Sequence, residues 1–287
     1  MGSSRRQSPD RIAIAAFSGW NDAGNAATTA LEMLIEGWDA EPFQGLDPED
    51  YHDFQVTRPK FFSIGPERNL IWPVTRLFRT TTPKGREVVL VDGIEPSMRW
   101  EQFCSEVLMI LKNERVTTLI VLGALLADVP HTRPIPVTGT SDSPRLRKRY
   151  GLETNDYSGP TGIVGVLDYT ASHYAKMDSM TLWAAVPHYV ANPPNPKAVM
   201  ALMTKIEEIM GEPLDIADLP EEARAWTEGV DALASEDEDI AEYVAQLEAA
   251  KDAVDSPDAS GEALAREFQR YLHRRDQSGP GDRPPTK

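Results

Sequence analysis

The chain has 287 residues, of which 41% are hydrophobic and 26% are charged, a composition typical of a globular protein with one large or two ordinary domains. It has no run of about 20 apolar residues, which excludes a membrane-spanning helix, and its formal net charge of -16 argues against a nucleic-acid partner. Cys104 is the only cysteine, which excludes an internal disulfide and a thiolate metal cluster.

Apolar runs and turn residues predict alternating strands and helices between residues 12 and 211. The predicted strands are 12–17, 87–91, 117–122 and 180–186, and the predicted helices are 26–35, 100–111, 163–174 and 196–210. Asn21 and Asp22 are candidates to cap the first helix, and Gly211 ends the last. In the third helix, Ile163, Val166, Leu167 and Tyr174 are expected to point inward.

Two further β-rich stretches, 60–64 and 74–80, lie between the first two strand-helix units and are separated by Pro66 and Pro73. They indicate an antiparallel insertion. Because strands otherwise alternate with helices, we predict an α/β fold, a three-layer α/β/α sandwich around a mostly parallel, mixed central sheet.

The charge is concentrated near the carboxyl end. Between residues 212 and 262 we count 17 acidic and two basic residues, a local net charge of 2 - 17 = -15. We expect a core domain at 11–211 and an acidic helical extension at 212–275, with disordered ends at 1–10 and 276–287. In the extension, Ser235 and Glu238 fit a capping box, Ile240, Tyr243, Val244 and Leu247 form an apolar stripe, and a further helix is predicted at about 261–274.

The loops after the strands are where ligands bind in open α/β sheets. The first such loop, 18–24, reads Ser-Gly-Trp-Asn-Asp-Ala-Gly, and its candidate binding residues are Ser18, Gly19, Trp20, Asn21, Asp22 and Gly24. Such a turn can present backbone N–H groups to an anion or a nucleotide, although its spacing fits neither common phosphate-binding motif. Alternatively, Asn21 or Asp22 only caps the following helix.

Three other loops supply candidates. Asp92, Gly93 and Glu95 follow the second strand, and the carboxylates could act in acid-base chemistry or bind a hydroxyl, or merely form a turn. Asp128, His131 and Arg133 lie in the proline-rich loop 123–139 and could have a catalytic role, although a stiff loop of this kind also suits an interface. Thr161 and Gly162 open a helix, as an anion site or as a close helix-sheet contact.

The remaining polar and thiol groups suggest no further site. Cys104 lies on an apolar helix face and is interpreted as a core thiol. Arg145, Arg147, Lys148 and Arg149 form a basic cluster that we place in a surface loop. The histidines lack metal-ligand spacing, and no nucleophile-elbow motif occurs. We therefore predict no catalytic set, no metal and no cofactor, and leave enzymatic activity open.

Four segments together resemble the bacterial branch of the proteasome assembly chaperone 2 family: AAFSGWNDAG at 15–24, VDGIEP at 91–96, GALLADVPHTRP at 123–134 and GPTGI at 159–163. The resemblance covers about residues 11–211. It implies a sandwich similar to nucleoside phosphorylases and hydrolases, and a tendency to form oligomers. The best-understood eukaryotic and archaeal members of the family are chaperones that dock on proteasome α-rings through a hydrophobic-Tyr-any-residue tail, whereas this chain ends in Pro284-Pro285-Thr286-Lys287.

Two functions follow as hypotheses. The first is a cytoplasmic, non-enzymatic assembly or interaction protein that forms homo-oligomers and has a protein partner, related to proteasome assembly, with neither nucleic acid nor membrane involved. The alternative is a small-molecule enzyme or sensor of phosphorylase or hydrolase type, which would bind a nucleoside-like or phosphorylated ligand at 18–24, Glu95 and His131.

Overall fold

A computed structural model describes residues 11–255 of the chain. The chain divides into two units, Met1–Leu233 and Ala234–Lys287, which are described separately. The first unit extends past the expected boundary at residue 212, because Leu219 of helix α7 is buried in the same core as the central sheet. The expected disordered ends and the predicted helix at 261–274 lie outside the described residues.

The first unit and the start of the second contain nine strands and eight α-helices. The strands are β1 (Ile12–Ser18), β2 (Glu41–Gly45), β3 (Lys60–Ile64), β4 (Glu67–Ile71), β5 (Arg76–Thr81), β6 (Glu87–Ile94), β7 (Thr118–Ala127), β8 (Val137–Thr140) and β9 (Asp178–Pro187). The helices are α1 (Ala26–Gly37), α2 (Pro48–Tyr51), α3 (Trp100–Asn113), α4 (Pro144–Tyr150), α5 (Ile163–Thr170), α6 (Pro196–Met210), α7 (Leu219–Ser235) and α8 (Glu238–Asp255). Three short helical turns, η1 (Ala23–Asn25), η2 (Ala171–Ala175) and η3 (His188–Val190), complete the described elements.

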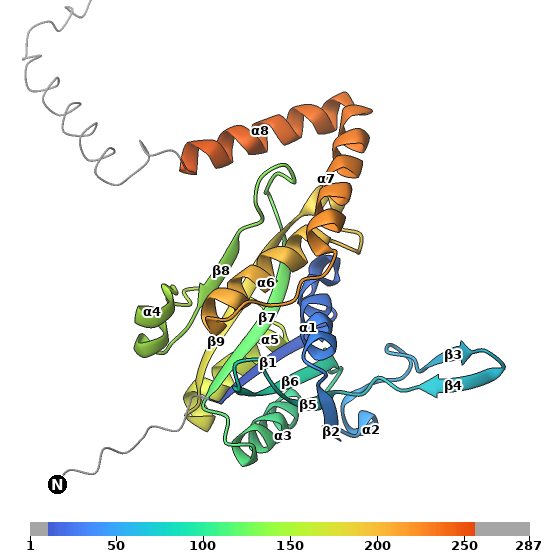
Figure 1. Ribbon diagram of the computed structural model, residues 1–287, viewed down its shortest axis with the longest axis vertical. Coiled ribbons are helices and arrows are strands. Elements are labelled where there is room, and N and C mark those ends of the chain that lie inside the picture. Colours follow the sequence, from blue (N-terminus) through green and yellow to red (C-terminus); the bar gives the residue numbers. More distant parts are fainter. Residues whose placement is uncertain (1–10, 256–287) are drawn as a thin grey trace, which may run out of the picture. The chain divides into compact units, whose positions relative to one another are not determined.

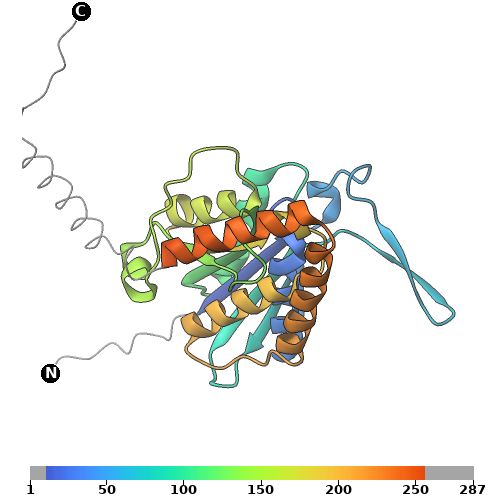
Figure 2. The same cartoon turned by 90° about the horizontal axis from the view of Figure 1, so that it is seen from above.

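Seven strands form one mixed sheet in the order β2-β5-β6-β1-β7-β9-β8. The central strands β6, β1, β7 and β9 run parallel to one another, whereas β2, β5 and β8 pair antiparallel at the two edges. Helices cover both faces of the sheet, as Figures 1 and 2 show. The predicted fold class, an α/β sandwich with a mostly parallel, mixed sheet, is confirmed.

The two hydrophobic cores explain this arrangement. Residues 12–17 are all buried, as expected for a central parallel strand that is covered on both faces. Ile14 packs in the core under α1 and α6, and the neighbouring Ala15 packs in the core under α3 and α5. Cys104 is fully buried in the second core, as predicted, and burial raises the pKa of its thiol to about 12.

The predicted core strands and helices are confirmed, but several details differ. Residues 60–64 do not pair with 74–80: β3 pairs with the unpredicted β4, whereas β5 joins the main sheet. Tyr174 is 72% exposed because α5 gives way to the π-helical turn η2 before reaching it. The basic cluster at 145–149 lies in helix α4, not in a loop.

The β3–β4 hairpin is a separate two-stranded sheet that extends away from the body of the first unit (Figures 1 and 2). Its large apolar side chains are exposed: Phe61 by 60%, Phe62 by 56%, Leu70 by 42% and Ile71 by 45%. Partners across the hairpin share a face, so Phe61 lies with Leu70 and Phe62 lies on the opposite face. Apolar groups therefore occur on both faces.

In the second unit, the predicted capping box is wrong. Ser235 is the last residue of α7, and the carboxylate of Asp237 accepts the hydrogen bonds from the N–H groups of Asp239 and Ile240 at the start of α8. An aspartate at this position satisfies free helix donors as well as a serine would. None of the described helices is long and apolar enough to cross a membrane.

Candidate functional site

The turn after β1 is shaped by two glycines and one aspartate. Gly19 and Gly24 have φ angles of 130° and 63°, which glycine adopts most readily. Asp22 accepts hydrogen bonds from the backbone N–H of Ala27 at 2.7 Å and from the N–H and hydroxyl of Thr28. Burial raises the pKa of the Asp22 carboxyl against the opposing effect of these bonds. Asp22 thus caps α1 from inside the turn, three residues before the formal N-cap, Asn25.

Asn21 links this turn to two other loops. Its side-chain Nδ2 donates to Glu95 Oε1 over 2.6 Å, and the same oxygen accepts the backbone N–H of Ile163 at 2.9 Å. Gly162 makes room for the link, because a Cβ atom there would lie 2.2 Å from Asn21 Oδ1. Asn21 is 1% exposed. The three predicted segments 18–24, 92–96 and 158–162 therefore meet, joined by hydrogen bonds within the chain.

A cavity of about 810 Å³ adjoins this link. The turn at 19–25 forms part of its wall, together with the carboxyl end of β7, strands β8 and β9, the loop at 155–161 and residues 191 and 193. Of the predicted site residues, those that line the cavity are Gly19, Trp20, Asp22, Gly24 and Thr161. Its volume is within the roughly 300–1,000 Å³ range of small-molecule sites.

Trp183 of β9 gives the cavity an aromatic surface. It pairs with Gly123 of β7 in the parallel ladder, and a Cβ atom on Gly123 would lie 2.6 Å from the six-membered ring of Trp183. The indole ring therefore lies directly against the glycine backbone. Trp183 and the neighbouring Thr138 were not among the predicted residues. The glycine that ends the predicted strand 117–122 was the only sequence signal that a bulky group approaches β7.

The predicted residues of the loop 123–139, Asp128, His131 and Arg133, do not line this cavity. His131 is 1% exposed and is held by Tyr189 and Asp231: its Nδ1 lies 2.7 Å from the Tyr189 hydroxyl and its Nε2 lies 2.9 Å from Asp231 Oδ1. Lys197 donates to its carbonyl oxygen. Asp128 is an exposed partner of His188 at 3.3 Å. These contacts attach the loop to η3, α6 and α7.

Arg133 and Ser18 are two further predicted site residues. The Arg133 guanidinium lies 3.4 Å from the Thr132 hydroxyl, and Ser18 ends β1, where its carbonyl accepts the N–H of Glu95. Neither residue lines the cavity.

Asp92 and Gly93 lie inside β6 and not in a loop. Burial, and then the nearby carboxylates Glu32 and Asp22, raise the pKa of Asp92 to about 6, against the opposing charge of Arg76. Gly93 lies against Thr75, whose hydroxyl would be 2.5 Å from a Cβ atom at that position. Asp92 of β6, Glu32 of α1 and Asp22 of the turn after β1 thus form a group of carboxylates that repel one another.

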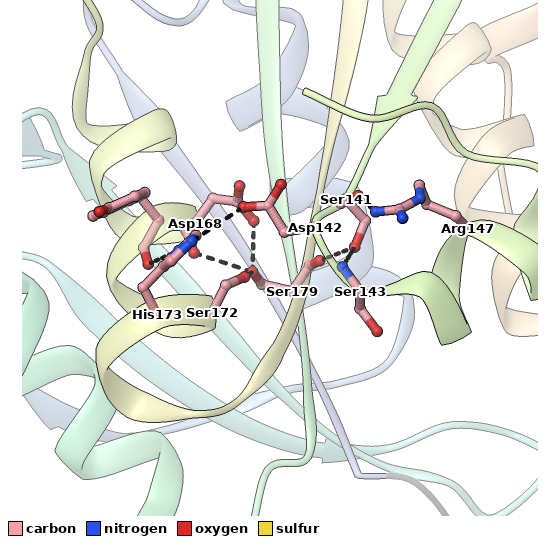
Figure 3. A network of polar contacts seen from close by, with 9 residues as sticks. Ser141, Asp142, Ser143, Arg147, Asp168, Ser172, His173 and Ser179 are labelled. Atoms are coloured by element: carbon pink, nitrogen blue, oxygen red, sulfur yellow. Dashed lines mark hydrogen bonds and ion pairs between the residues drawn. The ribbon is translucent and has the colours of Figure 1, made fainter. Parts of the chain in front are cut away.

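A second polar network lies around the beginning of β9 (Figure 3). The Ser179 hydroxyl donates to Asp168 Oδ1 at 2.6 Å and lies 2.6 Å from the Ser172 hydroxyl. His173 instead contacts Asp142 at 3.8 Å and stacks on Tyr169. No hydrogen bond joins His173 to either serine in the described part of the chain, so the serine, histidine and aspartate side chains do not form a nucleophile-base pair.

Burial raises the pKa of Asp168 in this network to about 6, with the Ser179 hydrogen bond acting in the opposite direction. The network therefore ties η2 and α5 to β9. It lies at the amino end of a parallel strand, where open sheets of this class seldom bind ligands.

A smaller cavity, of about 400 Å³, includes Arg11, Arg79, Glu87 and Glu114 in its lining. These charges neutralise one another, because Arg11 pairs with Glu87 at 2.5 Å and Arg79 pairs with Glu114 at 2.6 Å. Arg79 also lies over the ring of Phe43. The arrangement is explained by contacts within the chain.

Comparison with known proteins decides the family. The model of the PAC2 family matches residues 16–234. The chain belongs to the PAC2 family. A PAC2 family protein from Streptomyces avermitilis is 50% identical, with 82% of this chain and all of that chain covered and a TM-score of 0.77. The Mycobacterium tuberculosis proteasome-assembly chaperone homologue Rv2125 is 44% identical over 81% of this chain and 99% of that one, with a TM-score of 0.74.

More distantly related solved structures share the fold. Pyrococcus furiosus PbaB, an archaeal proteasome activator, is 16% identical over 78% of this chain and 93% of its own, with a TM-score of 0.62. A search of curated proteins found no match. The predicted family is confirmed. A function for this PAC2 chain has to be inferred from its own residues.

Proposed function

We propose that this PAC2 protein is a non-enzymatic assembly protein that associates with itself, and with a protein partner, through the β3–β4 hairpin. The observation that carries the proposal is the exposure of Phe61, Phe62, Leu70 and Ile71 on a hairpin that forms its own sheet. An isolated two-stranded hairpin is only marginally stable in water, and clustered exposed apolar side chains mark interaction sites.

The polar residues of the four loops support a non-enzymatic role. The Glu95 carboxylate accepts hydrogen bonds from Asn21 and Ile163. Asp22 caps α1, and His131 is hydrogen-bonded to Tyr189 and Asp231. These groups act within the fold, so they explain their own positions without a substrate. The relatives named as a proteasome-assembly chaperone homologue and a proteasome activator make proteasome assembly the process to test first.

Size-exclusion chromatography with light scattering tests self-association of the full chain. We expect the unaltered chain to form an oligomer. Phe62→Asp should lower the measured molar mass of that oligomer, because the new carboxylate would be buried in the contact between subunits. Met109→Asp is the matched control, since Met109 of α3 is 56% exposed outside the hairpin. A monomer at every concentration, together with no reproducible partner for the chain in pull-downs from native lysate, would refute the proposal.

A ligand-binding role is the second candidate function. The cavity of about 810 Å³ at the carboxyl ends of β1, β7 and β9 favours it. A thermal-shift screen of small molecules tests this role independently of self-association, and a complete absence of shifts and of binding signals would count against it.

A further inference from the structure

The cavity beside residues 19–25 lacks cationic side chains. None of the described residues that line it is a lysine, an arginine or a histidine. Nucleotides and other phosphorylated compounds need such groups, or a cluster of free backbone N–H donors, to replace their hydration. In this turn, the N–H groups of Asp22 and Asn25 already donate to carbonyl oxygens at 3.2 Å and 3.1 Å. An anionic ligand would therefore lose water without gaining a cationic side chain as a counter-charge.

The polar groups of the lining are largely engaged with one another. The hydroxyls of Thr140 and Thr181 lie 2.8 Å apart, and the Tyr157 hydroxyl donates to the carbonyl of Pro160 at 2.8 Å. Both carboxylate oxygens of Asp22 accept hydrogen bonds from α1. A cationic ligand therefore also finds the lining carboxylate already occupied.

The apolar part of the lining includes two tryptophan side chains, Trp20 and Trp183. Because Gly123 has no side chain, the ring of Trp183 lies directly against its backbone. Residues of the two neighbouring strands, β7 and β8, flank the ring. Leu125 and Leu126 at the end of β7 are 43% and 51% exposed, and Trp20 is 68% exposed. Aromatic rings bind such surfaces by offset stacking or edge contact, in addition to the gain from burying apolar area.

From these features we infer that the cavity is a binding site for an uncharged, planar, hydrophobic ring compound, which stacks against Trp183 between Leu125 and Thr138. This inference rests on the second candidate function, ligand binding, and names its ligand class. It is independent of the hairpin and of self-association.

Three probes with one ring system and different charges test the inference on the full chain. They are 3-methylindole, indole-3-acetate and tryptamine, and their dissociation constants can be measured by ligand-observed NMR. We expect 3-methylindole to bind at least about tenfold more tightly than either charged probe, because burying an unpaired charge is unfavourable. Equal or tighter binding of a charged probe would overturn the ligand class but leave ligand binding intact. No binding of any of the three probes would overturn the inference, whereas ligand binding itself is tested by the thermal-shift screen.

Variants locate the site. Thr138→Trp fills the cavity from the exposed edge strand β8, and Leu125→Asp adds an anion to its wall; each should weaken 3-methylindole binding at least about tenfold. Leu125→Lys should raise the affinity for indole-3-acetate relative to the unaltered chain, because it supplies the missing cation. Met109→Asp is again the control and should leave all three affinities unchanged.

Circular dichroism and the elution volume establish that each variant is folded. If folded Thr138→Trp and Leu125→Asp proteins bind 3-methylindole as tightly as the unaltered chain, the compound occupies another place and the inference is wrong. If Leu125→Lys leaves the affinity for indole-3-acetate unchanged, the bound ring does not lie beside Leu125 and the proposed position of the ligand is wrong.

Discussion

Asn21 Nδ2 donates a hydrogen bond to Glu95 Oε1 over 2.6 Å, which joins the turn after β1 to the turn after β6. The same carboxylate oxygen receives the backbone N–H of Ile163, the first residue of α5. One acceptor thus fixes three segments beside the cavity. The position of the cavity wall therefore depends on a residue that does not itself line it.

We expect Glu95→Ala to lower the free energy of unfolding by about 3 kcal/mol, because it leaves the Asn21 amide and the Ile163 N–H without their acceptor. Glu95→Gln keeps an oxygen in place and should cost less than about 1 kcal/mol. Urea denaturation measures both. If glutamine is as harmful as alanine, the negative charge of Glu95, and not only the position of its oxygen, is required for stability.

The carboxyl of Asp92 makes stability depend on pH. Its folded-state pKa of about 6 lies above its ordinary value of 3.8. As pH rises, the carboxyl loses its proton in the unfolded state first. The stabilisation that is present below about pH 4 is therefore lost progressively between about pH 4 and pH 6. Asp92→Asn cannot ionise. It should therefore be more stable than the unaltered chain at pH 8, by about 1–2 kcal/mol after allowance for its partial exposure, and nearly equal at pH 4.

Urea denaturation at the two pH values checks this expectation. Glu41→Gln removes a carboxylate from the exposed strand β2 and should change stability by less than about 0.5 kcal/mol at either pH. If the Asp92→Asn protein differs from the unaltered chain by the same amount at pH 4 and pH 8, ionisation of Asp92 is not the cause.

We expect His131 to stabilise the fold and not to bind the ligand. The Tyr189 hydroxyl accepts the backbone N–H of His131 at 2.7 Å and can donate its own hydrogen to Nδ1, so the tautomer with hydrogen on Nε2 satisfies Asp231 as well. We expect His131→Ala to lower stability by about 3 kcal/mol, since it removes a buried side chain and its hydrogen bonds. Its affinity for 3-methylindole should be unchanged, because His131 does not line the cavity.

Asp231→Asn is the matched control for His131→Ala. The amide oxygen can still accept from Nε2, so the loss of stability should stay below about 1 kcal/mol. Denaturation and ligand-observed NMR on the same samples separate the two roles. A folded His131→Ala protein with normal stability and weakened probe binding would assign His131 to the ligand site instead.

The sequence predicted the central sheet well because its strands are buried on both faces and read as continuous apolar runs, as in residues 12–17. It missed β2 and β8, which lie at the sheet edges and carry mixed polar residues. Edge strands are defined by their partners more than by their own pattern. The same reasoning explains β4, whose residues ERNLI show no clear alternation.

The candidate site was predicted in part. Residues 18–24 and Glu95 meet because they follow the neighbouring parallel strands β1 and β6 at the carboxyl end of the sheet. Residues 161–162 lie there because the backbone N–H of Ile163 binds Glu95. His131 lies elsewhere because its contacts with Tyr189 and Asp231 join positions 58 and 100 residues away. Trp183 was assigned only to a predicted strand, and which face of a strand borders a cavity depends on tertiary packing. Long-range contacts of this kind leave no local pattern.

Gly123 should control the aromatic surface of the cavity. A methyl group there would lie 2.6 Å from the Trp183 ring, so Gly123→Ala should displace the indole, lower stability by about 1–3 kcal/mol through overpacking and weaken 3-methylindole binding. Gly229→Ala in α7 meets nothing within 4 Å and should raise stability by about 0.5–1 kcal/mol. Denaturation and NMR titration measure both effects. If Gly123→Ala lowers stability but binds 3-methylindole as well as the unaltered chain does, Trp183 packs the sheet without forming the ligand surface.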